Sequence, residues 1–161
     1  MPTALIIGGP CGVGKSTISK MIADSYSYVH CDCDAFKWMY SHERSKERTA
    51  IGETLGFAYA KEILEQKRDI IIEALPEMYL EKLKPLLSKH GYTVVRIRLA
   101  APLSQCLANN AQRKTKYYHS DVIRDVYDKY SHEPGDLIDA TGKTARQVFE
   151  IIRKKYFSHS R

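Results

Sequence analysis

The most constraining feature of this chain is a glycine-rich segment near its start, "GGPCGVGKST", which follows the apolar run "ALII". Within it, Gly9-x4-Gly14-Lys15-Ser16 fits the Walker A pattern, and a helical pattern follows, as that motif requires. Its glycines let successive backbone N–H groups surround a phosphate, and the positive end of the following helix favours the same anion. The segment therefore predicts a binding site for a nucleoside triphosphate.

The residues of this segment have separate expected roles. The loop N–H groups would bind the β-phosphate, Lys15 would bridge the β- and γ-phosphates, and the Ser16 hydroxyl would ligate Mg²⁺. The predicted nucleotide-binding residues are Gly9, Gly12, Val13, Gly14, Lys15, Ser16 and Thr17. We therefore expect ATP and Mg²⁺ as cofactors, with Thr17 in reach of the α-phosphate.

Strand-like and helical segments alternate along the chain. The expected strands are residues 3–8, 28–32, 69–74, 93–99 and 136–140; the expected helices are 15–25, 45–66, 77–90, 103–112, 121–130 and 144–156. This alternation predicts an α/β fold, a three-layer sandwich with a five-stranded parallel sheet and helices on both faces. We expect a single domain over residues 1–161, with a short lid at about 113–120, where "RKTKYYHS" has no clear period.

Composition and cysteine spacing indicate the cellular location expected for such a protein. No apolar run approaches the ~20 residues of a membrane span, and no basic segment followed by an apolar core opens the chain. The four cysteines follow no zinc or disulfide spacing. We therefore expect a soluble, cytoplasmic protein without membrane contact.

The net charge of +6 is unevenly spread, with −3 over residues 1–81 and +7 over residues 82–130. A basic middle section suits an anionic partner, and solvated helix faces on a basic protein would give the same distribution.

Other motifs that accompany a Walker A loop separate the protein classes. A GTPase would need Asp-x-x-Gly and then Asn-Lys-x-Asp, whereas the only Asp-x-x-Gly is Asp139–Gly142 and no Asn-Lys-x-Asp occurs. Motor and transporter ATPases have far longer chains. The small P-loop kinases remain, with a non-catalytic nucleotide-binding switch domain as the alternative from another class.

The segment "HCDCDAFK" supplies carboxylates at the end of the second expected strand. Ligands of open α/β sheets gather beyond the carboxyl ends of the strands, and strand alternation would point Asp32 and Asp34 the same way. A kinase that acts on a hydroxyl needs a carboxylate to orient the attacking oxygen and accept its proton. Asp34 is the predicted base, against the alternative of two solvated loop carboxylates.

The glycine loop, "DAFK" and "QRKTKYYHSDVIRDVYDKY" together resemble the kinase domain of phage polynucleotide 5′-kinases. In that family, an Asp-x-x-Arg motif provides the general base and an arginine that touches the phosphate beside the acceptor, and a lid with arginines closes on ATP. The resemblance implies that Asp34 is the base, that Lys37 contacts the acceptor phosphate and that Arg113 acts from the lid. Only the glycine loop is strongly specific.

Two departures from that family pattern stand out. Lys37 replaces an arginine, so the charge remains but the bidentate fork is lost. Asn109 stands where a second lid arginine is expected, which leaves Arg113 with Lys114 or Lys116 to meet the transition-state charge.

The "DCD" triplet also resembles the Asp-x-Asp of shikimate kinases and a similar motif of gluconate kinases. That resemblance implies that Asp32 assists Mg²⁺ through water and that Asp34 holds the substrate hydroxyl. The third expected strand ends in "IIIEALPEMY", which has no Arg or Gly to bind a substrate carboxylate, so a small acidic substrate fits poorly. Glu73 in this segment is a candidate Walker B-like carboxylate near Mg²⁺, with a structural role as the alternative.

These observations predict an ATP-dependent kinase, a phosphotransferase with an alcohol acceptor. The favoured acceptor is a polynucleotide or nucleotide 5′-hydroxyl; the alternative is a small-molecule hydroxyl on a sugar, polyol, nucleoside or antibiotic. Three aromatic residues flank the expected site loops and are candidates to stack on a base, although packing is the commoner role: Trp38, Tyr117 and Tyr118.

Overall fold

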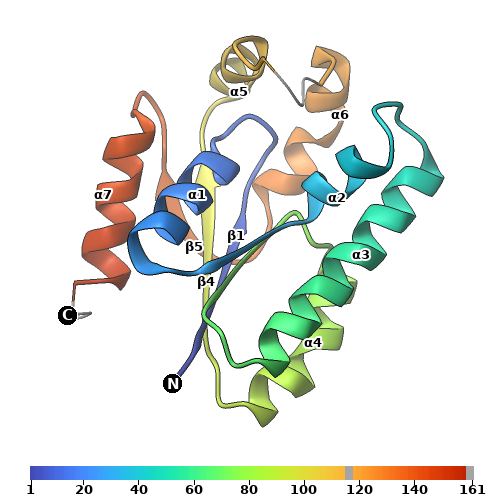
Figure 1. The fold of residues 1–161 in the computed structure, drawn as a ribbon. Helices are drawn as coiled ribbons and strands as arrows, with labels where there is room; N and C mark the ends of the chain where they lie inside the picture. The colour runs from blue at the N-terminus through green and yellow to red at the C-terminus, as the bar shows by residue number, and fades with distance from the viewer. Residues whose placement is uncertain (115–117, 159–161) are drawn as a thin grey trace. The chain divides into compact units, whose positions relative to one another are not determined.

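The computed structural model describes residues 1–114 and 118–158, and Lys116 and Tyr117 of the predicted lid lie outside these described residues. Within the described chain, five strands form one sheet in the order β2-β3-β1-β4-β5 (Figure 1). Their bounds are β1 (Thr3–Gly8), β2 (Val29–Asp32), β3 (Ile70–Glu73), β4 (Thr93–Ala100) and β5 (Asp136–Asp139). The sheet is parallel with helices on both sides, which confirms the predicted α/β fold class.

Seven helices occur in the described residues: α1 (Lys15–Tyr26), α2 (Cys33–Tyr40), α3 (Lys46–Glu65), α4 (Glu77–Lys89), α5 (Leu103–Ala111), α6 (Ser120–Ser131) and α7 (Ala145–Tyr156). Six of them match the helices predicted from the sequence to within about two residues, which is the usual uncertainty of a helix end. Helix α2 was not predicted, and it changes how the acceptor-side carboxylates are held.

The chain divides into two compact units. The first unit comprises Met1–Ile6 and Ala23–Val95, and the second comprises Ile7–Ile22 and Arg96–Arg161. The glycine loop and the predicted lid belong to the second unit, whereas Asp32, Asp34 and Lys37 belong to the first. A single functional domain over residues 1–161 stays a prediction.

The first unit is built on β2, β3, α3 and α4. Strands β2 and β3 pair in parallel from Val29↔Ile70 to Asp32↔Glu73, so their carboxyl ends are level. Apolar residues of both strands and both helices form its core, among them Ile70, Ile72, Leu64 and Leu83. This core fixes the strand ends that carry the acceptor-side carboxylates.

Helix α2 packs closely on α3 because α3 has glycines on the contact face. A Cβ atom on Gly52 would lie 2.8 Å from the backbone nitrogen of Lys37, and one on Gly56 would lie 2.7 Å from the Sγ of Cys33. The thiols of Cys31 and Cys33 approach the carbonyl oxygens of Gly56 and Gly52 at 3.5 and 3.6 Å. Cys33 is the first residue of α2. Burial raises the pKa of its thiol to about 12.

The second unit packs α7 against β5. Strands β4 and β5 pair in parallel from Ile97↔Asp136 to Ala100↔Asp139. Helix α7 begins with a capping box in which the Thr144 hydroxyl accepts from Gln147 N and the Gln147 side chain accepts from Thr144 N. Its buried residues, Val148, Phe149 and Ile152, recur at helical spacing and form its inner face.

Candidate active site

The glycine loop lies between β1 and α1, as predicted. Gly9 and Gly12 have φ angles of +126° and +85°, which residues with a side chain rarely adopt. A Cβ atom at either position would also collide with a backbone carbonyl oxygen, that of Leu99 beside Gly9 and that of Cys106 beside Gly12. The loop conformation therefore depends on glycine at both positions.

Lys15 is the first residue of α1, and its ammonium group bends back over the loop. Its Nζ donates to the carbonyl oxygens of Gly9 and Pro10 at 2.7 and 3.0 Å. Ser16 and Thr17 follow in the first turn of α1, which contains no acidic residue. The positive end of the helix dipole therefore meets no carboxylate of its own turn, an arrangement that suits a bound phosphate.

Two side chains distant in sequence hold the loop backbone. The Oε2 of Glu133 accepts from the N–H of Gly9 at 2.7 Å, and the Nδ2 of Asn109 donates to the carbonyl oxygen of Gly12 at 2.9 Å. Asn109, which stands at the position expected for a second lid arginine, thus supports the loop backbone. Sequence analysis missed Glu133, because it belongs to no motif and lies 124 residues from its partner.

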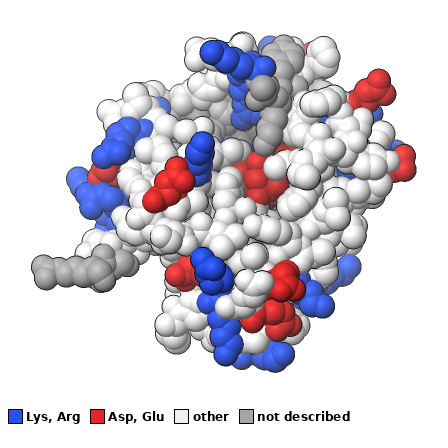
Figure 2. Space-filling model, viewed as in Figure 1, with Lys and Arg blue, Asp and Glu red and all other residues white. Residues whose placement is uncertain are grey.

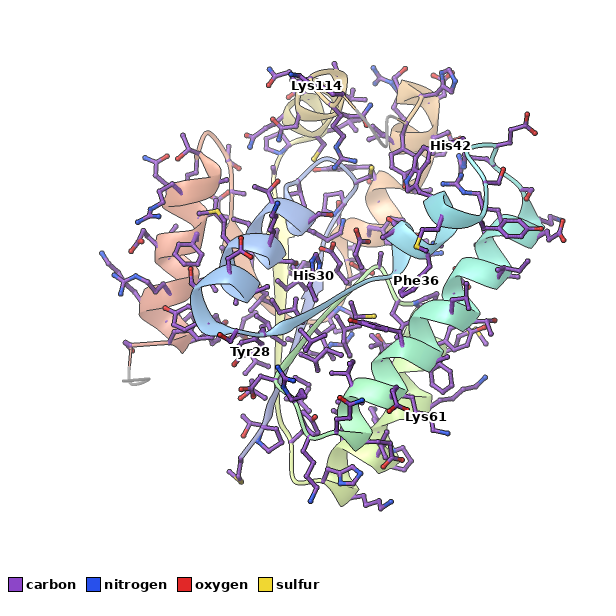
Figure 3. All side chains as sticks on the ribbon, viewed as in Figure 1. Tyr28, His30, Phe36, His42, Lys61 and Lys114 are labelled. Carbon is purple, nitrogen blue, oxygen red and sulfur yellow. The ribbon has the colours of Figure 1, made fainter. Side chains whose placement is uncertain are left out.

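The predicted lid follows α5 and is only partly described. The backbone N–H of Arg113 donates to the carbonyl of Asn110 at 3.1 Å. The buried Asn110 side chain donates to the carbonyl of Tyr118 at 2.6 Å and accepts from its N–H at 3.2 Å. Asn110 therefore ties together the two ends of this segment, whereas a catalytic role for Arg113 stays a prediction. Lys114, labelled in Figure 3, is exposed.

Asp32 and Asp34 do not extend from one strand as predicted. Strand β2 ends at Asp32, and this residue is the N-cap of α2: its Oδ1 accepts from the backbone nitrogens of Asp34 and Ala35 at 3.0 and 3.2 Å. Asp34 lies in the first turn of α2, where a carboxylate is stabilised by the helix dipole. The expectation of a shared strand face is therefore wrong, because an aspartate that ends a strand can also start a helix.

Lys37 lies one turn further along α2 and contacts two carboxylates. Its Nζ is 3.0 Å from the Oδ1 of Asp34 and 3.8 Å from the Oε1 of Glu53 on α3. Burial alone would lower the pKa of Lys37, but the charge and hydrogen bond of Asp34, with Cys33 and Glu53, raise it above its ordinary value of 10.5. The side chain is thus a charged partner of Asp34. Sequence analysis missed Glu53, which carries no motif.

Glu73 ends β3 and is 2% exposed. Its Oε1 lies 3.0 Å from the Nε2 of His30 on β2, and its Cα partner across the strands is Asp32. His30, labelled in Figure 3, was not singled out from the sequence. Ala74, directly after Glu73, has a φ of +58°, a strained conformation for a residue with a side chain.

The donor set fits Mg²⁺ that is bound largely by phosphates and water. Mg²⁺ prefers hard oxygen ligands and uses one or two protein groups with substrate phosphates in place of an all-protein cage. Among the described residues, no group of three or more His, Cys, Asp or Glu side chains forms such a cage. The Ser16 hydroxyl in the second unit, and the Asp32 and Glu73 carboxylates in the first, have the required chemistry. Their joint use by one ion stays a prediction.

A phosphate-binding loop between the first strand and helix of this parallel sheet defines the class: the protein is a P-loop protein with the small-kinase fold. The chain belongs to the family described as an AAA domain, whose model matches residues 5–134. No curated protein matches the sequence. Among the described helices, none is both long enough and apolar enough to cross a membrane.

Solved structures share the fold over nearly the whole chain. A gluconokinase from Sinorhizobium meliloti 1021 has a TM-score of 0.64 and 15% identity, covering 99% of this chain and 98% of that one. A sugar kinase from Janibacter sp. HTCC2649 has a TM-score of 0.67 and 16% identity, with coverage of 96% and 94%. The Deinococcus radiodurans tunicamycin resistance protein has a TM-score of 0.62 and 16% identity, with coverage of 96% and 95%. These similarities confirm the predicted P-loop kinase fold.

Proposed function

We propose that the protein is an ATP-dependent kinase that transfers the γ-phosphoryl group to a hydroxyl of a small molecule. The observation that carries this proposal is the Asp34–Lys37 pair in α2, in a chain whose second unit holds a complete phosphate-binding loop. A nucleotide-binding switch needs the loop alone. A carboxylate paired at 3.0 Å with a half-buried ammonium group is the part a phosphotransferase adds.

The second unit supplies the donor chemistry in this proposal. The N–H groups of Val13 and Gly14 and the ammonium group of Lys15 bind the phosphates, so Lys15 exchanges its loop carbonyl partners for phosphate oxygens. The Ser16 hydroxyl is the proposed protein ligand of Mg²⁺, which neutralises charge on the β- and γ-phosphates when bound. Asp32 and Glu73 remain its predicted water-mediated partners.

The first unit supplies the acceptor chemistry. The acceptor hydroxyl donates a hydrogen bond to Asp34, which orients its oxygen and takes its proton as the bond to the γ-phosphorus forms. The bond between that phosphorus and the β,γ-bridging oxygen breaks, and ADP leaves with the electron pair. Lys37 holds Asp34 in one orientation and stabilises its negative charge before the transfer.

Two observations favour a small acceptor over the polynucleotide predicted from the sequence. Lys37, expected to touch a phosphate beside the acceptor, is within ion-pair distance of Asp34 and Glu53. The basic residues 82–130 are divided between the two units, and on the face shown in Figure 2 the Lys and Arg side chains stand in separate groups interspersed with Asp and Glu. The similar structures described as gluconokinase and sugar kinase agree with a small acceptor.

The test is transfer of label from γ-labelled ATP to a panel of sugars, polyols, nucleosides and antibiotics, with a 5′-hydroxyl oligonucleotide in parallel. We expect label on a small acceptor and none on the oligonucleotide at any salt concentration. Asp34→Asn should lower the rate of transfer by about 10²–10⁴-fold, and Asp24→Asn, which changes an exposed aspartate on α1, is the matched control. Label on the oligonucleotide alone would establish the polynucleotide acceptor instead. ATP binding without transfer to any acceptor would favour the switch domain.

A further inference from the structure

Arg48, in the first turn of α3, is 3% exposed, and it is the only buried Lys or Arg among the described residues. Its Nε donates to the carbonyl oxygen of Lys37 at 3.1 Å, and its Cζ lies 4.4 Å from the centre of the Trp38 ring. Within the described residues, no carboxylate lies within ion-pair distance of this guanidinium. A positive charge is therefore buried in the first unit without a counter-charge.

Such a charge is unfavourable for the protein by itself. Buried charges in proteins are normally paired, because removing an ion from water costs far more than burying a neutral side chain of similar size. The stacking contact with Trp38 offsets only part of that cost. The buried carboxylate of the same unit, Glu73, by contrast has a hydrogen-bond partner in the Nε2 of His30 at 3.0 Å. The missing counter-charge at Arg48 is what a bound anion would supply.

The orientation of the guanidinium suits an anionic ligand. Its Cζ lies over the Trp38 ring and its Nε donates to the carbonyl oxygen of Lys37, so the two Nη groups are the donors left for other partners. Neither Nη of Arg48 is among the fully buried side-chain nitrogens that lack a hydrogen bond in the described residues. The Nη groups therefore keep a small exposure in a residue that is 3% exposed overall, and their planar fork is suited to a carboxylate or phosphate, which it can bind through two hydrogen bonds.

The position of Arg48 links it to the proposed base. Trp38 follows Asp34 by four residues on α2, so the two side chains lie on one face of the helix, about 5–6 Å apart at Cβ. Lys37 joins both ends of this face, since its Nζ binds Asp34 and its carbonyl oxygen accepts from Arg48. Glycine at position 52 lets α3 hold α2 in this place.

We propose that Arg48 binds an anionic group of the acceptor, so that the substrate is a small polyol with a carboxylate or phosphate about one helical turn from the reacting hydroxyl. This inference rests on the proposed function, and it names the substrate class of the same site. It also revises the expectation that an acidic substrate fits poorly. That expectation considered only the segment after the third strand, whereas Arg48 comes from the start of α3.

The test uses Trp38, the only tryptophan of the chain, as a probe. Its fluorescence is followed in the full-length protein during titration with gluconate, glucose 6-phosphate and neutral glucose at constant ionic strength. We expect a saturable change with at least one anionic probe and none with glucose. Arg48→Gln should weaken that response by roughly 10- to 100-fold, whereas Arg44→Gln, an exposed arginine of the same α2–α3 link, should leave it unchanged.

Kinetics separates this inference from the proposed function. In transfer assays, Arg48→Gln should raise KM for the anionic acceptor about 10-fold or more and leave a neutral analogue unaffected. An equal loss for both acceptors, with a lowered unfolding midpoint, would show that Arg48 only supports α2, and the kinase proposal would stand. A fluorescence response that depends on Arg48, without transfer to any acceptor, would support the anion site and contradict the proposed kinase activity. Absence of a response to both anionic probes in the wild type would overturn the inference.

Discussion

The loop that would hold the donor and the helix pair that would hold the acceptor are built by different means. The donor loop is mostly backbone: Lys15, Asn109 and Glu133 all contact main-chain atoms of residues 9–12. The acceptor region is mostly side chains, in the pairs Asp34–Lys37 and Trp38–Arg48. A site formed by backbone groups can be recognised from a short contiguous sequence motif. A site formed by side chains depends on which residues, distant in the sequence, come into contact in the fold.

The largest expected effect tests the acceptor region alone. Asp34→Asn removes the proposed proton acceptor but keeps the size of the side chain, so we expect kcat to fall by about 10²–10⁴-fold. The Kd for ATP should stay the same, because the donor loop of the described chain is held by Lys15, Asn109 and Glu133. Steady-state kinetics and equilibrium ATP binding check both statements. An unchanged kcat would show that another group is the base.

The complementary change affects the donor region. Lys15→Ala removes a fixed positive charge from the loop, and we expect kcat to fall by about 10²–10³-fold with weaker ATP binding as well. The KM for the acceptor should change little, since the hydrogen bonds of Lys15 in the described residues go to its own loop. If acceptor KM rose as much as ATP affinity fell, the division between the two regions would be wrong.

A smaller effect is expected when the partner of the base is removed. Lys37→Met keeps much of the side-chain volume but leaves Asp34 without its ammonium partner, so we expect kcat to fall by about 10- to 100-fold through misplacement of the carboxylate. Lys46→Met, an exposed lysine in the first turn of α3, is the control and should be neutral.

The same variant makes a prediction about pH. Because the pKa of Lys37 is raised above 10.5 in the folded protein, its stabilising contribution is complete below that pH and is lost as pH rises through the folded value. Urea unfolding at increasing alkaline pH should therefore show a steeper loss of stability in the wild type than in Lys37→Met. Both proteins carry Cys33→Ala in this comparison, because burial raises the pKa of the Cys33 thiol while Lys37 lowers it, and removal of Lys37 would change the titration of that thiol. Parallel curves for the two proteins would contradict the assigned pairing.

The smallest expected effect concerns the backbone beside Glu73. Ala74 has a φ of +58°, so Ala74→Gly should relieve strain and raise the free energy of unfolding by about 0.5–1 kcal/mol. The matched change Ala23→Gly, within α1, should lower it by about 1 kcal/mol. Chemical denaturation of both variants provides the measurement. Destabilisation by both changes would mean that the contacts of the Ala74 methyl group stabilise the fold by more than the backbone strain destabilises it.

The contrast between the two regions also explains what the sequence could predict. The strand, loop and helix around Lys15 were predicted in full because their signals are local: an apolar run, glycines at fixed spacing and a helical period. Helix α2 was missed because no turn residue separates it from β2, although Asp32 is a typical N-cap residue. Glu53, Arg48 and Glu133 were missed for a different reason. Their roles depend on contacts across the chain that no local pattern encodes.

The hydrogen bonds from Asn110 to both backbone groups of Tyr118 have a consequence for how such a protein can change. They join positions 110 and 118 through the side chain of Asn110, which is 2% exposed. The entropic cost of closing a loop rises slowly with its length, by about 0.6 kcal/mol of free energy for each doubling. We therefore expect changes in the length of this segment to cost little stability, provided that Asn110 is kept.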